Sequence, residues 1–223
     1  MENWLVRDAL LVLLFAVQHT IGTRDFVKDF VKLFTGGRRY LWNLIYSITT
    51  LVIMYFMYVN WQRSDVLIWK AEGVWVYVIL GLNLFSNFMF LYMFKYTSFG
   101  AWLGVKQFYR MITGKKQDEV VYSFKTTGFK RYIRFPHHTF LIPIFWLLPT
   151  MTMDLVFLAI CGTVYTWVGT IHQDHRGRGY LGQKWVDYSK VTRIILPAPE
   201  HVIVDVLNFF RKKAGKDEKP KFH

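Results

Sequence analysis

The sequence predicts an all-α polytopic membrane protein with about five transmembrane helices. Its 223 residues are 53% hydrophobic, and the apolar residues gather in blocks. Residues 41–61 and 74–94 contain no charged side chain, and each is about long enough to cross a hydrocarbon core of roughly 30 Å. The apolar stretch 139–171 is too long for one crossing, and the turn sequence LPTMTMD near its middle predicts that the fourth and fifth helices form a tight hairpin.

The first predicted crossing, residues 4–22, is less apolar because Arg7 and Asp8 lie near its start. The segment lacks the basic opening region and the small-residue cleavage site of a signal peptide. We therefore expect it to be a membrane helix.

The distribution of Lys and Arg predicts the orientation. Loops 23–40 and 98–138 and the segment after residue 171 are basic, whereas the loop 62–73 is balanced. The positive-inside rule then places the N-terminus outside and the C-terminus inside. The net charge of +13 indicates contact with anionic lipid headgroups. Because the bases are spread over three membrane-proximal segments, we expect no nucleic-acid partner.

One domain is expected over residues 1–197, a helical membrane domain, followed by a basic juxtamembrane tail over 198–223. The protein is expected to be integral and multi-pass, in a bacterial or archaeal cytoplasmic membrane or in an organelle membrane. Cys161 is the only cysteine, so no disulfide forms within the chain.

Polar side chains gather at one predicted membrane depth, on the cytoplasmic side. Gln18, Arg134, Gln173, Asp174 and Arg176 lie there. Five of the seven histidines lie at the same depth, namely His19, His137, His138, His172 and His175. Separate helices that deliver polar groups to one level indicate a binding site between them. The alternative is that these are ordinary polar residues at helix ends.

Residues 128–197 carry a recognisable pattern. Its elements are an Arg-x-Pro, a helical hairpin with the turn PTMT, a Gly with a Tyr six residues after it, and a later Pro. The matching residues are Arg134, Pro136, Gly182, Tyr188 and Pro197. The segment resembles the C-terminal part of the methanethiol S-methyltransferase family. That family lies within the integral membrane methyltransferases that include isoprenylcysteine carboxyl methyltransferase.

The chain departs from the pattern of this wider group at four places. Phe135 stands where the group has His, and His138 stands where Tyr is common. The paired Glu is replaced by Gln173 and Asp174, and the first Tyr of the tail motif is Trp185.

The resemblance implies a cytoplasm-facing site for S-adenosylmethionine, with a small thiol or lipophilic acceptor entering from the membrane. It implies that Arg134 holds the cofactor carboxylate and that Asp174 binds its amino group or ribose. Trp185 and Tyr188 would flank the adenine or the sulfonium. The implied cofactor-binding residues are Arg134, Pro136, His138, Gln173, Asp174, Trp185 and Tyr188.

Two other functions stay open at this point. The first is a metal or haem site, since imidazole suits iron, copper and zinc; its candidate ligands are His19, His137, His138, His172 and His175. The second is a non-catalytic subunit of a membrane complex, in which Arg134 is an interfacial anchor and the histidines are satisfied polar contacts.

Overall fold

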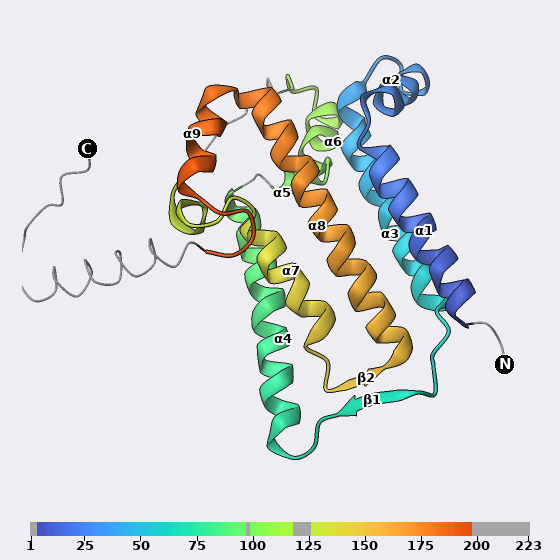
Figure 1. Ribbon diagram of the computed structural model, residues 1–223. Coiled ribbons are helices and arrows are strands. Elements are labelled where there is room, and N and C mark those ends of the chain that lie inside the picture. The colour runs from blue at the N-terminus through green and yellow to red at the C-terminus, as the bar shows by residue number, and fades with distance from the viewer. Residues whose placement is uncertain (1–3, 97–98, 118–125, 198–223) are drawn as a thin grey trace, which may run out of the picture.

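The computed structural model describes residues 4–96, 99–117 and 126–197, and most of these are helical (Figure 1). Within these residues, four helices are long and apolar enough to cross a membrane. They are α1 (Trp4–Gly22), α3 (Trp42–Asn60), α4 (Val74–Tyr92) and α8 (Met153–Leu181). A 3-10 turn, η2 (Met93–Tyr96), continues α4. The chain is therefore an all-α, polytopic membrane protein, as the sequence predicts.

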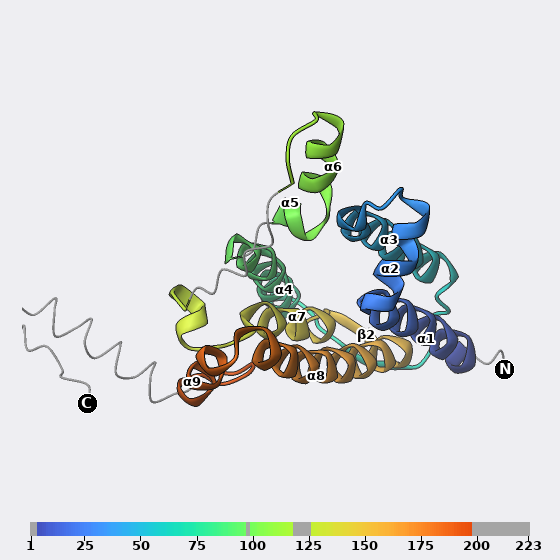
Figure 2. The same ribbon diagram turned by 90° about the horizontal axis from the view of Figure 1, so that it is seen from above.

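The helices form a curved row. Figure 2 shows α4, α7 (Pro136–Trp146), α8 and α1 side by side in that order, with α3 packed on α1. Two contacts in this row join helices that are distant in sequence: α4 packs on α7, and α1 packs on the far side of α8.

The hairpin of α7 and α8 differs in length from the prediction. α7 has 11 residues, so it is about 16 Å long and covers only about half of a bilayer core. α8 has 29 residues and is about 43 Å long. It was expected to end near residue 171, but it continues to Leu181 and carries His172 and His175 inside the helix. The number of crossings and the orientation stay predictions.

One end of the bundle is closed by two short strands that were expected to be a loop and a turn. β1 (Leu67–Lys70) and β2 (Thr150–Thr152) pair antiparallel. Beside them, the buried carboxylate of Asp154 accepts hydrogen bonds from Trp61 Nε1 (2.9 Å) and Ser64 N (3.0 Å). Asp8 is also fully buried, and its Oδ1 accepts a bond from Gln62 N (3.0 Å). These bonds fix the chain between α3 and β1 to α1 and α8.

The opposite end carries short helices and the basic segments (Figure 1). They are α2 (Asp25–Phe34), α5 (Phe99–Trp102), α6 (Val105–Ile112) and α9 (Gln183–Val191), with 3-10 turns η1 (Arg39–Leu41) and η3 (Gly128–Arg131). α6 lies within the basic segment 98–138. α2 was expected to be loop, and it exposes Phe26, Phe30, Leu33 and Phe34. The tail predicted for residues 198–223 lies outside the described residues.

Candidate functional site

α7, α8 and α9 meet at a buried corner around Arg134. The chain that enters α7 runs beside the chain that leaves α9: Arg134 N donates to Arg193 O (2.9 Å) and Phe135 N donates to Ile194 O (3.1 Å). α7 then starts at Pro136, which is fully buried. Proline suits this first helical position because its missing N–H would have had no partner within the helix. The backbone therefore fixes where the Arg134 side chain points.

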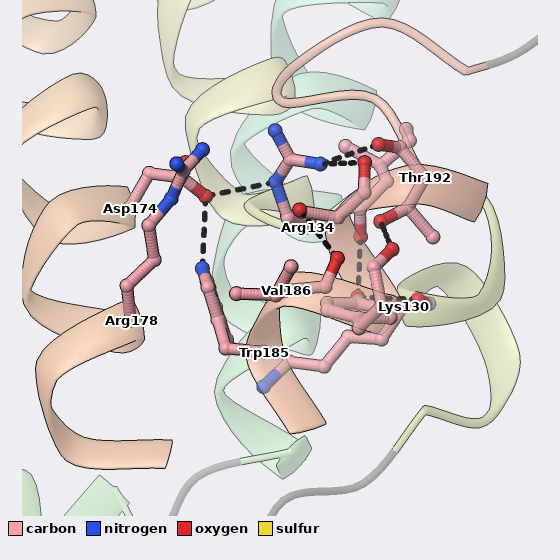
Figure 3. Close-up of polar contacts among 10 residues, drawn as sticks. Lys130, Arg134, Asp174, Arg178, Trp185, Val186 and Thr192 are labelled. Atoms are coloured by element: carbon pink, nitrogen blue, oxygen red, sulfur yellow. Dashed lines mark hydrogen bonds and ion pairs between the residues drawn. The ribbon is translucent and has the colours of Figure 1, made fainter. Parts of the chain in front are cut away.

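The Arg134 guanidinium joins the three helices. Its Nε lies 2.9 Å from Asp174 Oδ1 on α8, and both side chains are only 7% exposed. Its Nη1 donates to the carbonyl oxygens of Ser189 (2.9 Å) and Thr192 (2.5 Å) at the end of α9. A guanidinium at a helix C-terminus satisfies carbonyls that lack a partner within the helix. Figure 3 shows the second terminal nitrogen of Arg134 pointing away from Asp174 and Thr192, without a bond to the residues drawn.

Asp174 is shared by three donors. Besides Arg134, its Oδ1 accepts a hydrogen bond from Trp185 Nε1 (3.1 Å). Its Oδ2 lies 3.3 Å from Arg178 Nη2, whose side chain is 52% exposed. A buried carboxylate needs such compensation because desolvating an unpaired charge costs several kcal/mol.

An aromatic layer covers this ion pair. Phe135, Trp185 and Tyr188 pack together, with Leu181 and Ile194 against them. Two glycines make the layer possible. At Gly177, an added Cβ would lie 2.5 Å from a ring atom of Trp185, so only glycine leaves room for the indole. At Gly182, the positive φ of 54° turns the chain from α8 into α9.

Tyr188 ties the layer to the loop before α7. Its hydroxyl donates to Lys130 O (2.5 Å) and also lies 3.4 Å from Ile133 O. Burial raises the pKa of Tyr188 to about 12, so the hydroxyl keeps its proton at neutral pH. Burial also lowers the pKa of the Lys130 ammonium.

A row of polar side chains on α8 faces α7. Thr166, Thr170 and Asp174 recur every four residues, which places them on one face of the helix, and all three are buried. His138 on α7 meets this row, with Nδ1 2.7 Å from Thr170 Oγ1. The His138 ring also stacks on Phe135 at a centroid distance of 5.8 Å.

A groove of about 480 Å³ lies beside the corner, within the size range of small-molecule sites. Tyr188 and Thr192 belong to both the corner and the groove. The groove is lined by Thr126, Arg131, Lys184, Asp187, Tyr188, Val191 and Thr192. It therefore presents two cations and one carboxylate next to the aromatic layer.

The structure brings together most of the residues that the resemblance implied. Arg134, Asp174, Trp185 and Tyr188 are in contact through the bonds and rings described above, and His138 and Pro136 lie beside them. Gln173 does not join them: its side chain is exposed, because consecutive residues of a helix point in different directions. The sequence reasoning missed Thr166, Thr170 and Gly177, which as small residues in an apolar helix gave no signal.

The histidines do not converge. His19 Nδ1 bonds the Tyr46 hydroxyl (2.7 Å), and His172 Nε2 lies 3.3 Å from Arg24 Nη1. His175 is exposed, and His137 contacts the His138 ring. Across residues 4–96, 99–117 and 126–197, no three His, Cys, Asp or Glu side chains group as metal ligands. This placement gives the alternative metal or haem site no support.

Comparison with known proteins extends the resemblance over most of the chain. It is 26% identical over 202 residues to methanethiol S-methyltransferase of Pseudomonas deceptionensis, covering 87% of this chain and 73% of that protein. With the enzyme of Crocosphaera subtropica it shares 21% over 207 residues, covering 86% and 74%. With nurim of Rattus norvegicus it shares 26% over 169 residues, covering 71% and 62%.

These proteins are distant homologues of this chain. No protein-family model matches it, and no solved structure matches it. The match to nurim spans less than two thirds of nurim's own length. The membrane-length helices make the chain an integral membrane protein, and most of its length is similar to proteins named methanethiol S-methyltransferase.

Proposed function

We propose that this protein is a membrane methyltransferase that binds S-adenosylmethionine at the Arg134–Asp174 corner and methylates a small thiol or lipophilic acceptor. The observation that carries the proposal is the convergence of Arg134, Asp174, Trp185 and Tyr188 from three helices. Arg134 and Tyr188 match the pattern of the membrane methyltransferases, and Asp174 and Trp185 replace the Glu and Tyr of that pattern. The homologues of this chain include proteins named for methyl transfer.

The corner fits the charged end of the cofactor. One terminal nitrogen of Arg134 lies outside the internal network (Figure 3) and can donate to a carboxylate. Asp174 Oδ2 is held by Arg178 at 3.3 Å, the longest of its three contacts, and that arginine is half exposed. Movement of Arg178 into solvent would release the oxygen to accept from an ammonium group. When bound, the cofactor supplies a methyl group activated on a sulfonium.

The chain's own residues contribute position and enclosure. Trp185 and Tyr188 supply aromatic faces, which attract cations. The buried ion pair between Arg134 and Asp174 joins the segment before α7 to α8. The side chains that would contact the cofactor are therefore held in place before it binds. Holding two reactants in line can remove about 7–11 kcal/mol of the barrier to a displacement reaction.

The test is methyl transfer by the protein purified in lipid nanodiscs, with isotopically labelled S-adenosylmethionine and a panel of small thiols. Label should appear in an organic-extractable thioether. Asp174→Asn should lower this transfer at least tenfold, and Arg178→Gln, at the exposed partner, should change it little. Absence of transfer to every acceptor, together with absence of cofactor binding, overturns the proposal.

A non-catalytic role in a membrane complex is the second candidate. The observation in its favour is that the corner is largely satisfied internally. Asp174 pairs with Arg134 and accepts a hydrogen bond from Trp185, and Arg134 donates to carbonyl oxygens at the end of α9. Such a network can stabilise the packing of α7, α8 and α9 without binding a ligand. Under this alternative the wild-type protein folds but binds no S-adenosylmethionine, and Asp174→Asn reduces only its stability.

A further inference from the structure

Two short contacts at one hydroxyl identify the protonated nitrogen of His138. Thr170 Oγ1 lies 2.6 Å from Thr166 O and 2.7 Å from His138 Nδ1. Contacts this short between polar atoms require a hydrogen in each. The threonine hydroxyl has one hydrogen, and a carbonyl oxygen has none. The hydroxyl donates to Thr166 O, so the second hydrogen is carried by His138 Nδ1.

With this assignment, Nε2 is the ring nitrogen of His138 that can accept a proton. A neutral imidazole with a hydrogen on Nδ1 has its lone pair on Nε2. Among the described residues, no hydrogen bond is found to His138 Nε2, whereas Nδ1 is fixed by Thr170. This is the arrangement of a general base, in which one nitrogen is oriented by a protein group and the other is left to accept a proton.

His138 lies deeper in the helix bundle than the ion pair between Arg134 and Asp174. Thr170 and Asp174 lie one turn apart on the same face of α8. Thr170 holds His138, and Asp174 holds Arg134. Because α8 runs from the β1–β2 end toward the basic end (Figure 1), Thr170 is the one nearer the middle of the bundle. An acceptor that arrives through the membrane would meet His138 before it meets Arg134.

We propose that His138 is the general base that deprotonates a thiol acceptor; this inference rests on the proposed function. The S–H bond of the acceptor breaks and its proton passes to His138 Nε2. The thiolate sulfur forms a bond to the methyl carbon, and the bond from that carbon to the sulfonium breaks with its electron pair remaining on the donor sulfur. The imidazolium then returns its proton to water.

The first test reads the tautomer without any activity. The ring nitrogens of His138 in ¹⁵N-histidine-labelled wild-type protein are assigned by comparison with His138→Asn, and their shifts are measured by NMR. We expect a protonated Nδ1 and an unprotonated Nε2 in the neutral ring. A neutral ring with its hydrogen on Nε2 overturns the assignment of a base, whether or not the protein has activity.

The second test uses the acidity of the acceptor. His138→Asn keeps a donor near the position of Nδ1, so Thr170 stays bonded, but it removes the basic nitrogen. With an alkyl thiol, which must lose its proton, the transfer rate should fall about 100-fold or more. With an aryl thiol that is already ionised at the assay pH, it should fall less than about threefold. The matched control is His137→Asn, a change at the neighbouring ring. In this variant, methyl transfer to the alkyl thiol and to the aryl thiol should both stay close to the wild-type rate.

The outcomes separate the two proposals. If both thiols lose activity equally in His138→Asn while S-adenosylmethionine still binds, His138 is structural and the proposed function stands. If neither thiol loses activity, His138 is not the base. If the wild-type protein neither binds S-adenosylmethionine nor transfers a methyl group, the proposed function fails and the role of His138 fails with it.

Discussion

Arg134 and Asp174 lie 2.9 Å apart, Nε to Oδ1, in a part of the molecule where both side chains are only 7% exposed. Arg134 precedes α7, and Asp174 lies near the basic end of α8. Their ion pair, together with the bonds from Arg134 to the last carbonyls of α9, fixes the angle at which the three helices meet. The same pair forms the proposed cofactor site, so stability and binding depend on the same atoms.

Removal of the Asp174 charge should therefore destabilise the protein strongly. Asp174→Asn keeps the shape of the side chain but leaves the buried guanidinium of Arg134 without a counter-ion. Breaking a buried pair in this way costs about 3–5 kcal/mol. Thermal unfolding in detergent measures the loss. Arg178→Gln is the control, since its half-exposed contact should be worth no more than about 1 kcal/mol. Equal effects of the two variants would contradict a buried, interdependent pair.

Because Trp185 packs on α8 at Gly177, a methyl group added at this glycine should destabilise the protein. Gly177→Ala would place a Cβ 2.5 Å from the indole ring, and we expect it to destabilise the protein by about 1–3 kcal/mol. Gly179→Ala, in the same helix, meets no heavy atom within 4 Å. That control should stabilise the helix by about 0.5–1 kcal/mol. Unfolding temperatures that move in the same direction in both variants would show that Trp185 does not pack on Gly177.

The hydroxyl of Tyr188 should make part of the stability depend on alkaline pH. Burial raises its pKa from the ordinary value of 10 to about 12. A raised pKa in the folded state means that the contribution is fully present below pH 10 and is lost as the pH rises through about 12. Tyr188→Phe removes the bonds to Lys130 O and Ile133 O, at a cost of about 1 kcal/mol. The stability difference between wild type and this variant should be constant from pH 7 to about 9 and shrink above pH 10. A difference that is the same at pH 9 and at pH 12 would place the hydroxyl in solvent.

The long helices could be read from the sequence because apolar stretches of membrane length leave few alternatives. The shorter elements could not. The Lys and Arg residues of segment 23–40 predict a basic loop there, although the apolar residues from Phe26 to Phe34 recur with the spacing of the helix α2. β1 and β2 are too short to carry an alternating pattern and exist because they pair with each other. α8 extends past residue 171 because charged side chains do not end a helix.

The candidate site was predicted where side chains have a distinctive chemistry. Arg134, Asp174, Trp185 and Tyr188 were named from the resemblance, and the structure brings them together. Gln173 was named beside Asp174, but adjacent helix positions face apart. The role of Thr170 depends on which side chain lies across from it, and that is decided only when α7 packs on α8.

The most direct test of the central claim is calorimetric titration of S-adenosylmethionine into the protein purified in detergent. Wild type should bind saturably. Arg134→Lys, which keeps the charge but loses the planar fork of donors, should bind at least tenfold more weakly. Arg178→Gln, the control at the exposed partner of Asp174, should bind about as tightly as wild type. No saturable binding by well-folded wild-type protein, or equal binding by Arg134→Lys, would contradict a cofactor site at the Arg134–Asp174 corner.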